Sequence, residues 1–314
     1  MERIPVAAVV GPTATGKTRL AVGLALKFGG EIVSADSMQV YRGLNIGTAK
    51  PTPEEMQGVP HHLIGFLDPS QPFSVADYVG LASESIAEIS RRGKLPIVAG
   101  GTGLYARSLL GGLSFSPQGR DDTLREELRR KAECKGPQAL LEELRTFDPE
   151  SAERIHPNNV GRVIRAIEVY RVTGITMTEQ MRRSRQVPPP YDAVIIGLTY
   201  RDRAKLYGAI ERRVDGMMCA GLLKEAKAVF SMEHPGTAAQ AIGYKEFFPF
   251  FRGECSLEES VAQVKRESRK YAKRQLTWFR RDGSVEWLCV DEFNGFQALL
   301  LRACEIIRRK EWKQ

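Results

Sequence analysis

The sequence of 314 residues contains few cysteines, few histidines and no long apolar run. Its five cysteines are scattered, with no C-x-x-C spacing and no paired histidines nearby, so a zinc knuckle and a disulfide framework are both disfavoured. No apolar segment approaches the roughly 18 to 20 residues of a membrane span. The early apolar segment 6–10 runs into a glycine loop and not into a cleavage site. We therefore expect a cytoplasmic protein with free thiols and no membrane association.

Composition and charge narrow the class of protein. Hydrophobic residues make up 42% and charged residues 27% of the chain, proportions that argue against wholesale disorder and fibrous repeats. The formal net charge is +8 at pH 7. Such an excess of lysine and arginine favours a polyanionic partner, because each phosphate that is neutralised releases condensed counterions. The length predicts one core domain that carries a second, smaller unit.

Short β-branched segments alternate with amphipathic segments in the first third of the chain. We expect strands at residues 4–10, 31–35 and 95–99, and helices at residues 17–28 and 75–92. This alternation is typical of an α/β protein, here a parallel sheet of the P-loop NTPase type with helices on both faces. Each strand ends in a polar or glycine-rich loop, and ligands of open α/β sheets bind at that edge.

The composition changes near residue 112. Residues 121–145 and 149–173 are charged, helical in period and almost free of strand signal, which predicts an inserted helical domain. The insertion ends at three prolines, residues 188–190. We place the P-loop core at residues 1–111 and 191–314, and the inserted helical domain at residues 112–190.

The rest of the core gives weaker signals. Residues 43–72 are rich in proline and glycine and are predicted to be mostly loop. The apolar pattern predicts a buried strand at residues 193–198 and a further strand near the end of the chain at residues 287–290. No internal repeat of roughly 20 to 50 residues is visible, so a solenoid is not expected.

A segment between the first expected strand and the first expected helix fits G-x-x-x-x-G-K-[ST]. Its glycines let successive backbone N–H groups point at phosphate oxygens, and the helix adds the positive end of its dipole. Lys17 would neutralise the terminal phosphate, and the hydroxyl of Thr18 would help to hold Mg²⁺. The segment consists of Gly11, Pro12, Thr13, Ala14, Thr15, Gly16, Lys17 and Thr18. A phosphate site alone does not distinguish a kinase, a nucleotide switch and a diphosphate-using transferase.

Two further loops follow apolar strands and are expected at the same edge of the sheet. Asp36 stands directly after the second strand, where a carboxylate either binds magnesium or accepts a proton from a bound nucleophile. Ser37 and Gln39 supply further hydrogen-bonding groups suited to a base edge. Residues 100–103 end the third strand with the sequence Gly-Gly-Thr-Gly, which allows close backbone approach and brings in the hydroxyl of Thr102. Three loops are thus predicted to meet in one cleft.

Six motifs follow one another along the chain: GPTATGKT at 11–18, DSMQVYRGLNIGTAKP at 36–51, HHL at 61–63, AGGTGLY at 99–105, AIGYKE at 241–246 and YAKRQLTWFRR at 271–281. In this order they resemble the tRNA dimethylallyltransferase family, also called tRNA isopentenyltransferase, of bacterial type. The motifs span nearly the whole chain. Apart from the phosphate loop, no single motif indicates the family, but the six motifs taken together do.

The resemblance implies a reaction. The loop would hold dimethylallyl diphosphate with Mg²⁺, not ATP, and the acceptor would be the exocyclic amine of the adenosine 3′ to the anticodon. Because the lone pair of that amine is delocalised into the ring, the enzyme must activate it, and Asp36 would be the base that takes its proton. Lys17, Thr18 with magnesium, and an arginine would meet the charge on the leaving diphosphate. Thr102 would join these catalytic residues by contacting the base.

Arg213 is the candidate for that arginine, and Arg203 is a second candidate for contacting the diphosphate. Arg213 stands in the stretch 210–217, which resembles the family segment for such contacts. The chain departs from the family pattern here, because Ala209 stands where arginine is frequent.

The tRNA is expected to contact both the core and the insertion, since the adenosine must be unstacked and drawn into the cleft. Gly161 departs from the pattern, because glutamine is frequent there. Residues 265–281 could follow the RNA backbone and stack bases, or their aromatic positions could form core. The tRNA contacts that the resemblance implies are Asp36, Ser37, Met38, Gln39, Thr102, Arg125, Gly161, Arg162, Val163, Ile164 and Arg165.

Three other functions stay open at this point. An adenylate isopentenyltransferase would share the fold and the donor, although a free nucleotide needs no clamp of the kind the insertion predicts. A small-molecule kinase would bind ATP at the phosphate loop and use Asp36 on a hydroxyl or a metal. A non-catalytic RNA-binding module would carry the loop as a remnant. No feature of the sequence demands more than a monomer.

Overall fold

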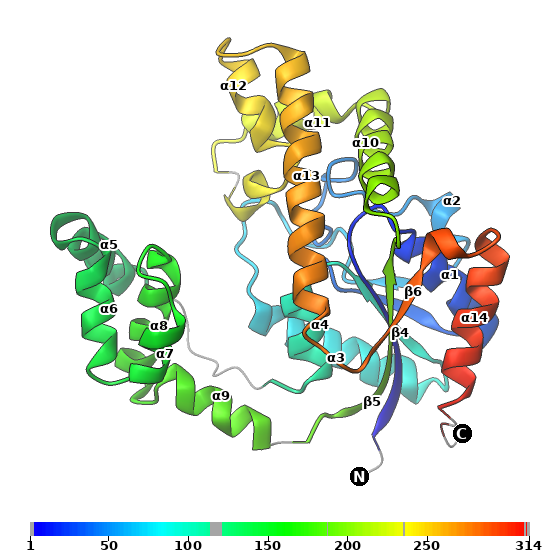
Figure 1. The fold of residues 1–314 in the computed structure, drawn as a ribbon, viewed down its shortest axis with the longest axis horizontal. Helices are drawn as coiled ribbons and strands as arrows, with labels where there is room; N and C mark the ends of the chain where they lie inside the picture. Colours follow the sequence, from blue (N-terminus) through cyan, green and yellow to red (C-terminus); the bar gives the residue numbers. More distant parts are fainter. Residues whose placement is uncertain (1–2, 114–120, 187, 235, 311, 313–314) are drawn as a thin grey trace. The chain divides into compact units, whose positions relative to one another are not determined.

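The computed structural model describes residues 3–113, 121–186, 188–234, 236–310 and 312 (Figure 1). The chain divides into two compact units, one formed by Met1–Leu110 with Pro190–Gln314 and the other by Gly111–Pro189. We call the first the core unit and the second the insertion.

The core unit contains a sheet of six strands in the order β3-β2-β4-β1-β5-β6. All of its strand pairs are parallel, which confirms the predicted fold class. In the central register Val10 lies opposite Gly100 on one side and Gly197 on the other, so the carboxyl ends of three strands meet at one edge. The strands are β1 (Ile4–Val10), β2 (Glu31–Ser34), β3 (His61–His62), β4 (Pro96–Gly100), β5 (Tyr191–Thr199) and β6 (Val285–Cys289).

Helices cover both faces of this sheet. The side chains of β1 alternate, and Ala7 and Val9 pack toward α1 (Lys17–Phe28) and α14 (Phe296–Arg308). Val6 and Ala8 pack on the other face, toward the helices α3 (Val75–Arg91) and α4 (Gly103–Leu110). Because both faces are covered, the central strand is a continuous apolar run and not an alternating one.

A third layer of the core unit is built from helices that follow β5. Its hydrophobic core includes Val214, Leu222, Tyr244 and Phe247, and the loop after β2 contributes Val40. The principal helices are α10 (Arg203–Cys219), α11 (Leu222–Phe230) and α13 (Leu257–Phe279). The shorter elements of this layer are η1 (Gly236–Gln240), η2 (Lys245–Phe247) and α12 (Phe248–Phe251). The short helix η3 (Val290–Glu292) follows β6, and Val290 packs with α1 and α14.

Two short elements lie where the sequence predicted mostly loop. The helix α2 (Pro53–Met56) forms because Thr52 and Glu55 make a reciprocal capping box and Pro53 stands at its first turn. The two-residue strand β3 adds His61 and His62 to the edge of the sheet beside β2. Both elements are too short to give a periodic pattern, so the prediction for residues 43–72 missed them.

The insertion is helical in its described residues. Its five helices surround a hydrophobic core that includes Leu128, Leu140, Leu144, Val163 and Ile167. They are α5 (Asp122–Lys135), α6 (Pro137–Arg145), α7 (Pro149–Arg154), α8 (Val160–Thr173) and α9 (Met177–Gln186). Within the described part of the chain, no helix combines the length and the apolarity needed to span a bilayer.

Candidate active site

The phosphate loop joins β1 to α1 and curls over its own lysine. The Nζ of Lys17 donates to the carbonyl of Pro12 at 2.7 Å, and the Thr15 hydroxyl donates to the same carbonyl at 2.9 Å. Gly11 has φ +134°, and a Cβ there would lie 2.3 Å from the carbonyl oxygen of Leu198. Only glycine fits at this position, because the loop passes close to the backbone of β5 there.

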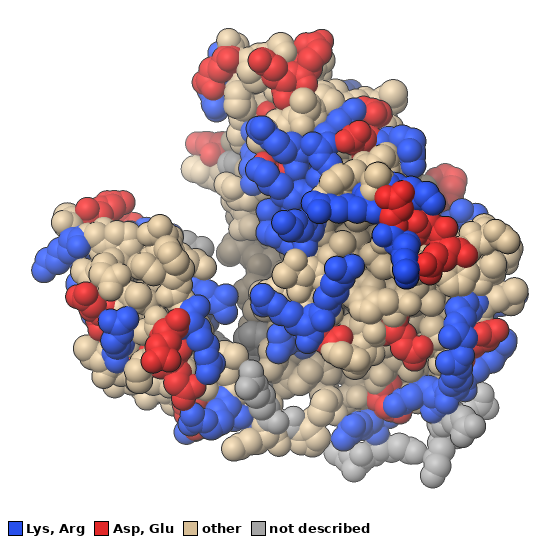
Figure 2. Space-filling model, in the orientation of Figure 1, with Lys and Arg blue, Asp and Glu red and all other residues tan. Residues whose placement is uncertain are grey.

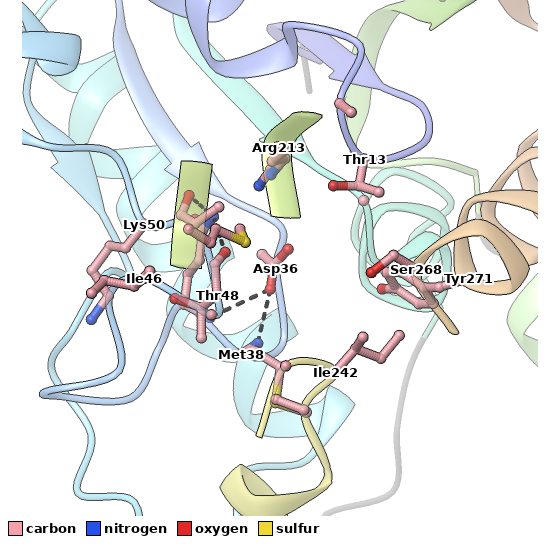
Figure 3. Close-up of a pocket in the computed structure, with 18 of the residues that line it drawn as sticks. Thr13, Asp36, Met38, Ile46, Thr48, Lys50, Arg213, Ile242, Ser268 and Tyr271 are labelled. Atoms are coloured by element: carbon pink, nitrogen blue, oxygen red, sulfur yellow. Dashed lines mark hydrogen bonds between the residues drawn. The ribbon is translucent and has the colours of Figure 1, made fainter. Parts of the chain in front are cut away.

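A cavity of about 780 Å³ opens beside this loop, and every residue that lines it belongs to the core unit (Figure 3). The loops after β1, β2 and β4 all reach it, as the sequence predicted. From the predicted site residues, the lining includes Thr13, Ala14, Gly16, Lys17, Thr18, Asp36, Ser37, Met38, Gln39 and Arg213.

Asp36 presents its carboxylate to the cavity from the end of β2. One oxygen, Oδ1, accepts hydrogen bonds from the backbone N–H of Met38 at 2.9 Å and of Gln39 at 3.4 Å. Among the described residues the other oxygen has no hydrogen-bond partner, so it is available to a ligand. The Thr102 hydroxyl accepts from the backbone N–H of Ser37 at 3.0 Å. The loop after β4 therefore holds the loop that carries Asp36.

Several cationic side chains line the cavity, and two of them, Lys17 and Arg213, lie close enough to this carboxylate for its charge to act on them. Burial and, to a lesser extent, the charge of Arg213 lower the pKa of Lys17 to about 7, with the charge of Asp36 acting in the opposite direction. Burial also lowers the pKa of Arg213, against the charges of Asp36 and Glu55. Figure 3 shows Arg213 of α10 next to Asp36. The cavity concentrates positive charge at the phosphate loop and is suited to a polyanion.

Helix α13 forms one wall of the cavity, and its contribution was only partly predicted. Tyr271 lines the cavity near Asp36, and burial, with the charge of Asp36 adding to it, raises the pKa of its hydroxyl to about 12. Gln275 is only 5% exposed. Its Oε1 accepts from the N–H of Thr13 and its Nε2 donates to the carbonyl of Gly101, each at 2.9 Å. The motif at 271–281 carries these residues, but no local signal assigns Gln275 a contact 262 residues away.

The other residues of that basic stretch divide by exposure. Phe279 is buried, and Trp278 packs against the same cluster, so the interpretation of the aromatic positions as core holds for both. Lys273, Arg274 and Arg280 are exposed. Figure 2 shows lysine and arginine side chains gathered over α13 and the neighbouring part of the core unit.

The AIGYKE motif holds a cavity loop in place. The carboxylate of Glu225 on α11 accepts hydrogen bonds from the backbone N–H groups of Asn45, Ile46 and Gly47 at 2.8 to 3.0 Å. It also accepts from the hydroxyl of Tyr244 at 2.7 Å. Residues 45–50 line the cavity. Sequence reasoning missed Glu225, because it stands in an ordinary amphipathic helix.

Two predicted contacts with ligands lie in other surroundings. Arg203 is exposed and is not part of the cavity lining; its Nε donates to the Tyr207 hydroxyl at 2.6 Å. The amide of Gln39 lines the cavity but is engaged with the fold, since Nε2 donates to the carbonyls of Thr48 and Ala49 at 3.3 and 3.1 Å. A base contact from Gln39 would have to displace these hydrogen bonds.

The residues of the insertion that were predicted to contact RNA differ in their exposure. Val163 and Ile164 are buried in its core, because the helical period of α8 turns them inward. Gly161 and Arg162 are exposed on the same helix. In this segment only the residues that are not buried are accessible to an RNA.

The two remaining predicted residues of the insertion are arginines that bind a buried carboxylate. Arg125 donates to both oxygens of Glu168 at 2.8 and 2.9 Å, and Arg165 donates at 2.6 Å. Burial by itself raises the pKa of Glu168, but these hydrogen bonds lower it to about 2. Arg125 thus joins α5 to α8, and its role in RNA binding stays a prediction.

The fold and the cavity define an α/β protein with a parallel sheet, whose site combines a glycine-rich loop, the cations Lys17 and Arg213, and the carboxylate of Asp36 with one available oxygen. The family model described as "IPP transferase" matches residues 39–282. A second model, "Isopentenyl transferase", matches residues 4–64. A tRNA dimethylallyltransferase of Geobacillus thermodenitrificans is 50% identical over 89% of this chain and 88% of its own length. That of Halalkalibacterium halodurans is 50% identical over 89% of both chains.

Solved structures agree with these relatives. The tRNA isopentenylpyrophosphate transferase of Bacillus halodurans is 44% identical, with a TM-score of 0.72 over 98% of this chain and 97% of its own. A eukaryotic dimethylallyltransferase, studied in crystals while acting on tRNA, has a TM-score of 0.83 at 29% identity, over 99% of this chain and 81% of its own.

The chain therefore belongs to the IPP transferase family, the family of these tRNA dimethylallyltransferases, and is a prenyltransferase. The predicted family and enzyme class are confirmed. The same relatives support tRNA dimethylallyl transfer over adenylate isopentenyl transfer and over a small-molecule kinase.

Proposed function

We propose that the cavity binds dimethylallyl diphosphate and transfers its allyl group to the exocyclic amine of the adenosine 3′ to the anticodon of a tRNA. One observation carries the proposal: the phosphate loop, Lys17 and Arg213 share a single cavity with the available carboxylate oxygen of Asp36. The cationic part suits the diphosphate. The carboxylate suits an amine that must lose a proton as it reacts.

The transfer balances with these groups alone. The amine nitrogen forms a bond to the first carbon of the allyl group, and the bond from that carbon to the diphosphate oxygen breaks. The electron pair of the broken bond leaves with the diphosphate. The proton of the amine passes to the carboxylate of Asp36 and from there to water. Diphosphate and the prenylated adenosine are the products.

The charge of Lys17 is expected to depend on the donor. In the free site its pKa is near 7 because of burial and the neighbouring charge of Arg213. A bound diphosphate places several negative charges beside the ammonium and favours its protonated form. Lys17 and Arg213 would then stabilise the charge that develops on the leaving oxygen, where one such group contributes on the order of a hundredfold or more in rate.

The residues present fit a magnesium ion that arrives with the diphosphate. Thr18 lines the same cavity as Lys17 and Asp36. Within the described ranges, no cluster of three or more His, Cys, Asp or Glu side chains could hold a metal by itself. Mg²⁺ prefers oxygen ligands and is commonly bound by substrate phosphates with few protein groups. When bound there through the Thr18 hydroxyl, the ion would supply further neutralisation of the diphosphate.

The acceptor must be drawn out of its stack before its amine can reach Asp36. Thr102 and Ser37 stand beside Asp36 and are suited to hold the base. Arg274 lines the cavity and is exposed on α13 together with Lys273, which suits an RNA backbone that approaches along this helix. The proposal needs only a monomer, working in the cytoplasm where tRNA is.

The experiment follows label from radiolabelled dimethylallyl diphosphate in the presence of Mg²⁺, with unmodified tRNA, AMP or no acceptor. A parallel reaction offers ATP labelled in its terminal phosphate. Label should appear in tRNA, and a tRNA with another base in place of that adenosine should stay unlabelled. Label in AMP with inert tRNA would establish the adenylate enzyme instead. Phosphate transfer from ATP would establish a kinase.

A further inference from the structure

A single buried side chain hydrogen-bonds to two of the loops that form the cavity. Gln275 of α13 accepts from the N–H of Thr13 and donates to the carbonyl of Gly101, each at 2.9 Å. A Cβ at Gly101 would lie 2.2 Å from the Gln275 nitrogen, so the glycine is what lets the amide approach the backbone. The carboxamide uses its acceptor on one loop and its donor on the other.

The two loops serve different halves of the reaction proposed above. Thr13 belongs to the phosphate loop, which would hold the donor. Gly101 precedes Thr102, whose hydroxyl accepts from the backbone N–H of Ser37 at 3.0 Å, and Ser37 follows Asp36. The distance between the diphosphate and the carboxylate is therefore set in part by the amide of Gln275.

The same helix also faces the cavity and the solvent. Tyr271, one turn before Gln275, and Arg274, directly before it, line the cavity, and Lys273 and Arg274 are also exposed. An RNA that engages α13 therefore contacts the element that carries Gln275. If the axis of α13 shifts, both ends of the Gln275 amide move together: the Oε1 that accepts from the Thr13 N–H and the Nε2 that donates to the Gly101 carbonyl.

We propose that Gln275 is a positioning residue that fixes the donor loop relative to the acceptor loop, and so couples diphosphate binding to RNA binding. The inference rests on the proposed function. Losing the amide leaves the Thr13 N–H and the Gly101 carbonyl without partners. Such losses change binding equilibria by about tenfold. The effect falls on coupling and on turnover, because Gln275 lines the cavity and both hydrogen bonds of its amide go to the backbone of the two loops.

The test measures the affinity of inorganic diphosphate with Mg²⁺ by calorimetry, with and without an unmodified anticodon stem-loop RNA. In the wild type, RNA should tighten diphosphate binding several-fold, and diphosphate should tighten RNA binding by the same factor, as linkage requires. Gln275→Met keeps an unbranched side chain of similar size and removes both hydrogen bonds. It should reduce the coupling factor to near one and lower kcat about tenfold, with little change in the affinity for RNA alone.

Two controls separate positioning from packing. Thr277→Ala changes an exposed residue on the same helix, whose hydroxyl only donates to its own helix at the Lys273 carbonyl, and should keep the coupling factor of the wild type. Gln275→Ala removes packing as well as hydrogen bonds. If Gln275→Ala loses the coupling while Gln275→Met retains it, packing carries the effect and the inference is overturned.

The inference can fail without the proposed function. A wild type that prenylates tRNA but shows no coupling, or a Gln275→Met variant with unchanged coupling and kcat, would overturn the inference alone. A wild type that binds no diphosphate and transfers no label would overturn the proposed function and remove the basis of the inference with it.

Discussion

At the scale of single residues, the site depends on charges held apart from their usual partners. Lys17 donates to the Pro12 carbonyl at 2.7 Å and has no carboxylate partner in the described part of the chain. One carboxylate oxygen of Asp36 accepts hydrogen bonds from the backbone N–H groups of Met38 and Gln39. Each side chain thus keeps part of its bonding capacity for a ligand, and its neighbours hold it in place.

The pKa of Lys17 leads to a first prediction. Near pH 8 the free enzyme holds this amine mostly neutral, since its pKa is about 7, and a bound diphosphate raises that pKa. Diphosphate binding at pH 8 should therefore take up close to one more proton in the wild type than in Lys17→Arg, whose guanidinium stays charged throughout. Calorimetry in two buffers with different ionisation enthalpies gives the proton count. Equal counts in both proteins would show that Lys17 is already charged in the free site.

At the scale of elements, helices far along the chain support loops near its start. Glu225 of α11 and Gln275 of α13 hold backbone groups at residues 45–47 and at Thr13. Both are ordinary positions in amphipathic helices, and each contact spans more than a hundred residues of sequence. Glu225 and Gln275 reach the loops of the site because tertiary packing places α11 and α13 against those loops.

Glu225 gives the second prediction. Replacing it by alanine leaves three backbone N–H groups and the Tyr244 hydroxyl without their acceptor. The free energy of unfolding should fall by about 2 to 4 kcal/mol, since unsatisfied buried groups cost about 1 to 3 kcal/mol each and neighbours relax in part. Urea denaturation measures this loss. Lys224→Ala, which changes the exposed neighbouring residue, should stay within about 0.5 kcal/mol of the wild type.

What the sequence predicts well is what a short segment encodes. The phosphate loop, the central strands and the place of Asp36 follow from local patterns, and the relatives confirm the fold class and family. The pattern at residues 161–165 gave five RNA contacts, yet Val163 and Ile164 are core and Arg165 pairs with Glu168. A family motif marks a segment, and only the helix geometry shows which of its side chains face outward.

Glu168 gives the third prediction, for the insertion. Its side chain is 1% exposed and its pKa is lowered from 4.5 to about 2. Because the folded-state value is the lower one, the stabilisation is complete above about pH 5 and is lost as the pH falls from 4.5 toward 2; the difference corresponds to about 3 kcal/mol. Glu168→Gln should therefore lose protection from hydrogen exchange in α5 and α8 at pH 6 and differ much less at pH 3.

A matched control for this prediction stands on α5. Glu126 is about half exposed and pairs only weakly, at 3.5 to 3.6 Å, with Arg129 and Arg130. Glu126→Gln should leave exchange nearly unchanged at both pH values. If the difference between Glu168→Gln and the wild type were the same at pH 3 and pH 6, the carboxylate charge would not be the cause.

At the scale of the whole molecule, the net charge of +8 is distributed so that exposed cations gather over α13 beside the cavity (Figure 2). This arrangement suits a polyanionic acceptor whose reacting base enters the cavity while its backbone stays outside. The insertion adds exposed cations of its own, among them Arg162. Recognition of tRNA is thus expected to combine phosphate contacts on the surface with base contacts at Asp36.

The fourth prediction concerns Lys273. Lys273→Ala should weaken tRNA binding and reduce the slope of log affinity against log salt concentration by about 0.7 to 0.9, the value for one phosphate contact. Filter binding at several salt concentrations measures both. Arg309→Ala removes an equal charge from an exposed position at the end of α14 and should leave the slope unchanged. Equal effects of the two variants would point to net charge alone.

The assignment of Asp36 as the base is tested most directly by the single-turnover rate of prenyl transfer to tRNA. The rate of Asp36→Asn is compared with that of the wild type at saturating donor and tRNA. The rate of Asp36→Asn should be at least a hundredfold lower, because the asparagine oxygen cannot take the proton of the amine. The affinity for diphosphate should be retained, because that oxygen can still accept the N–H of Met38. A rate within a few-fold of the wild type would contradict the assignment of Asp36 as the base.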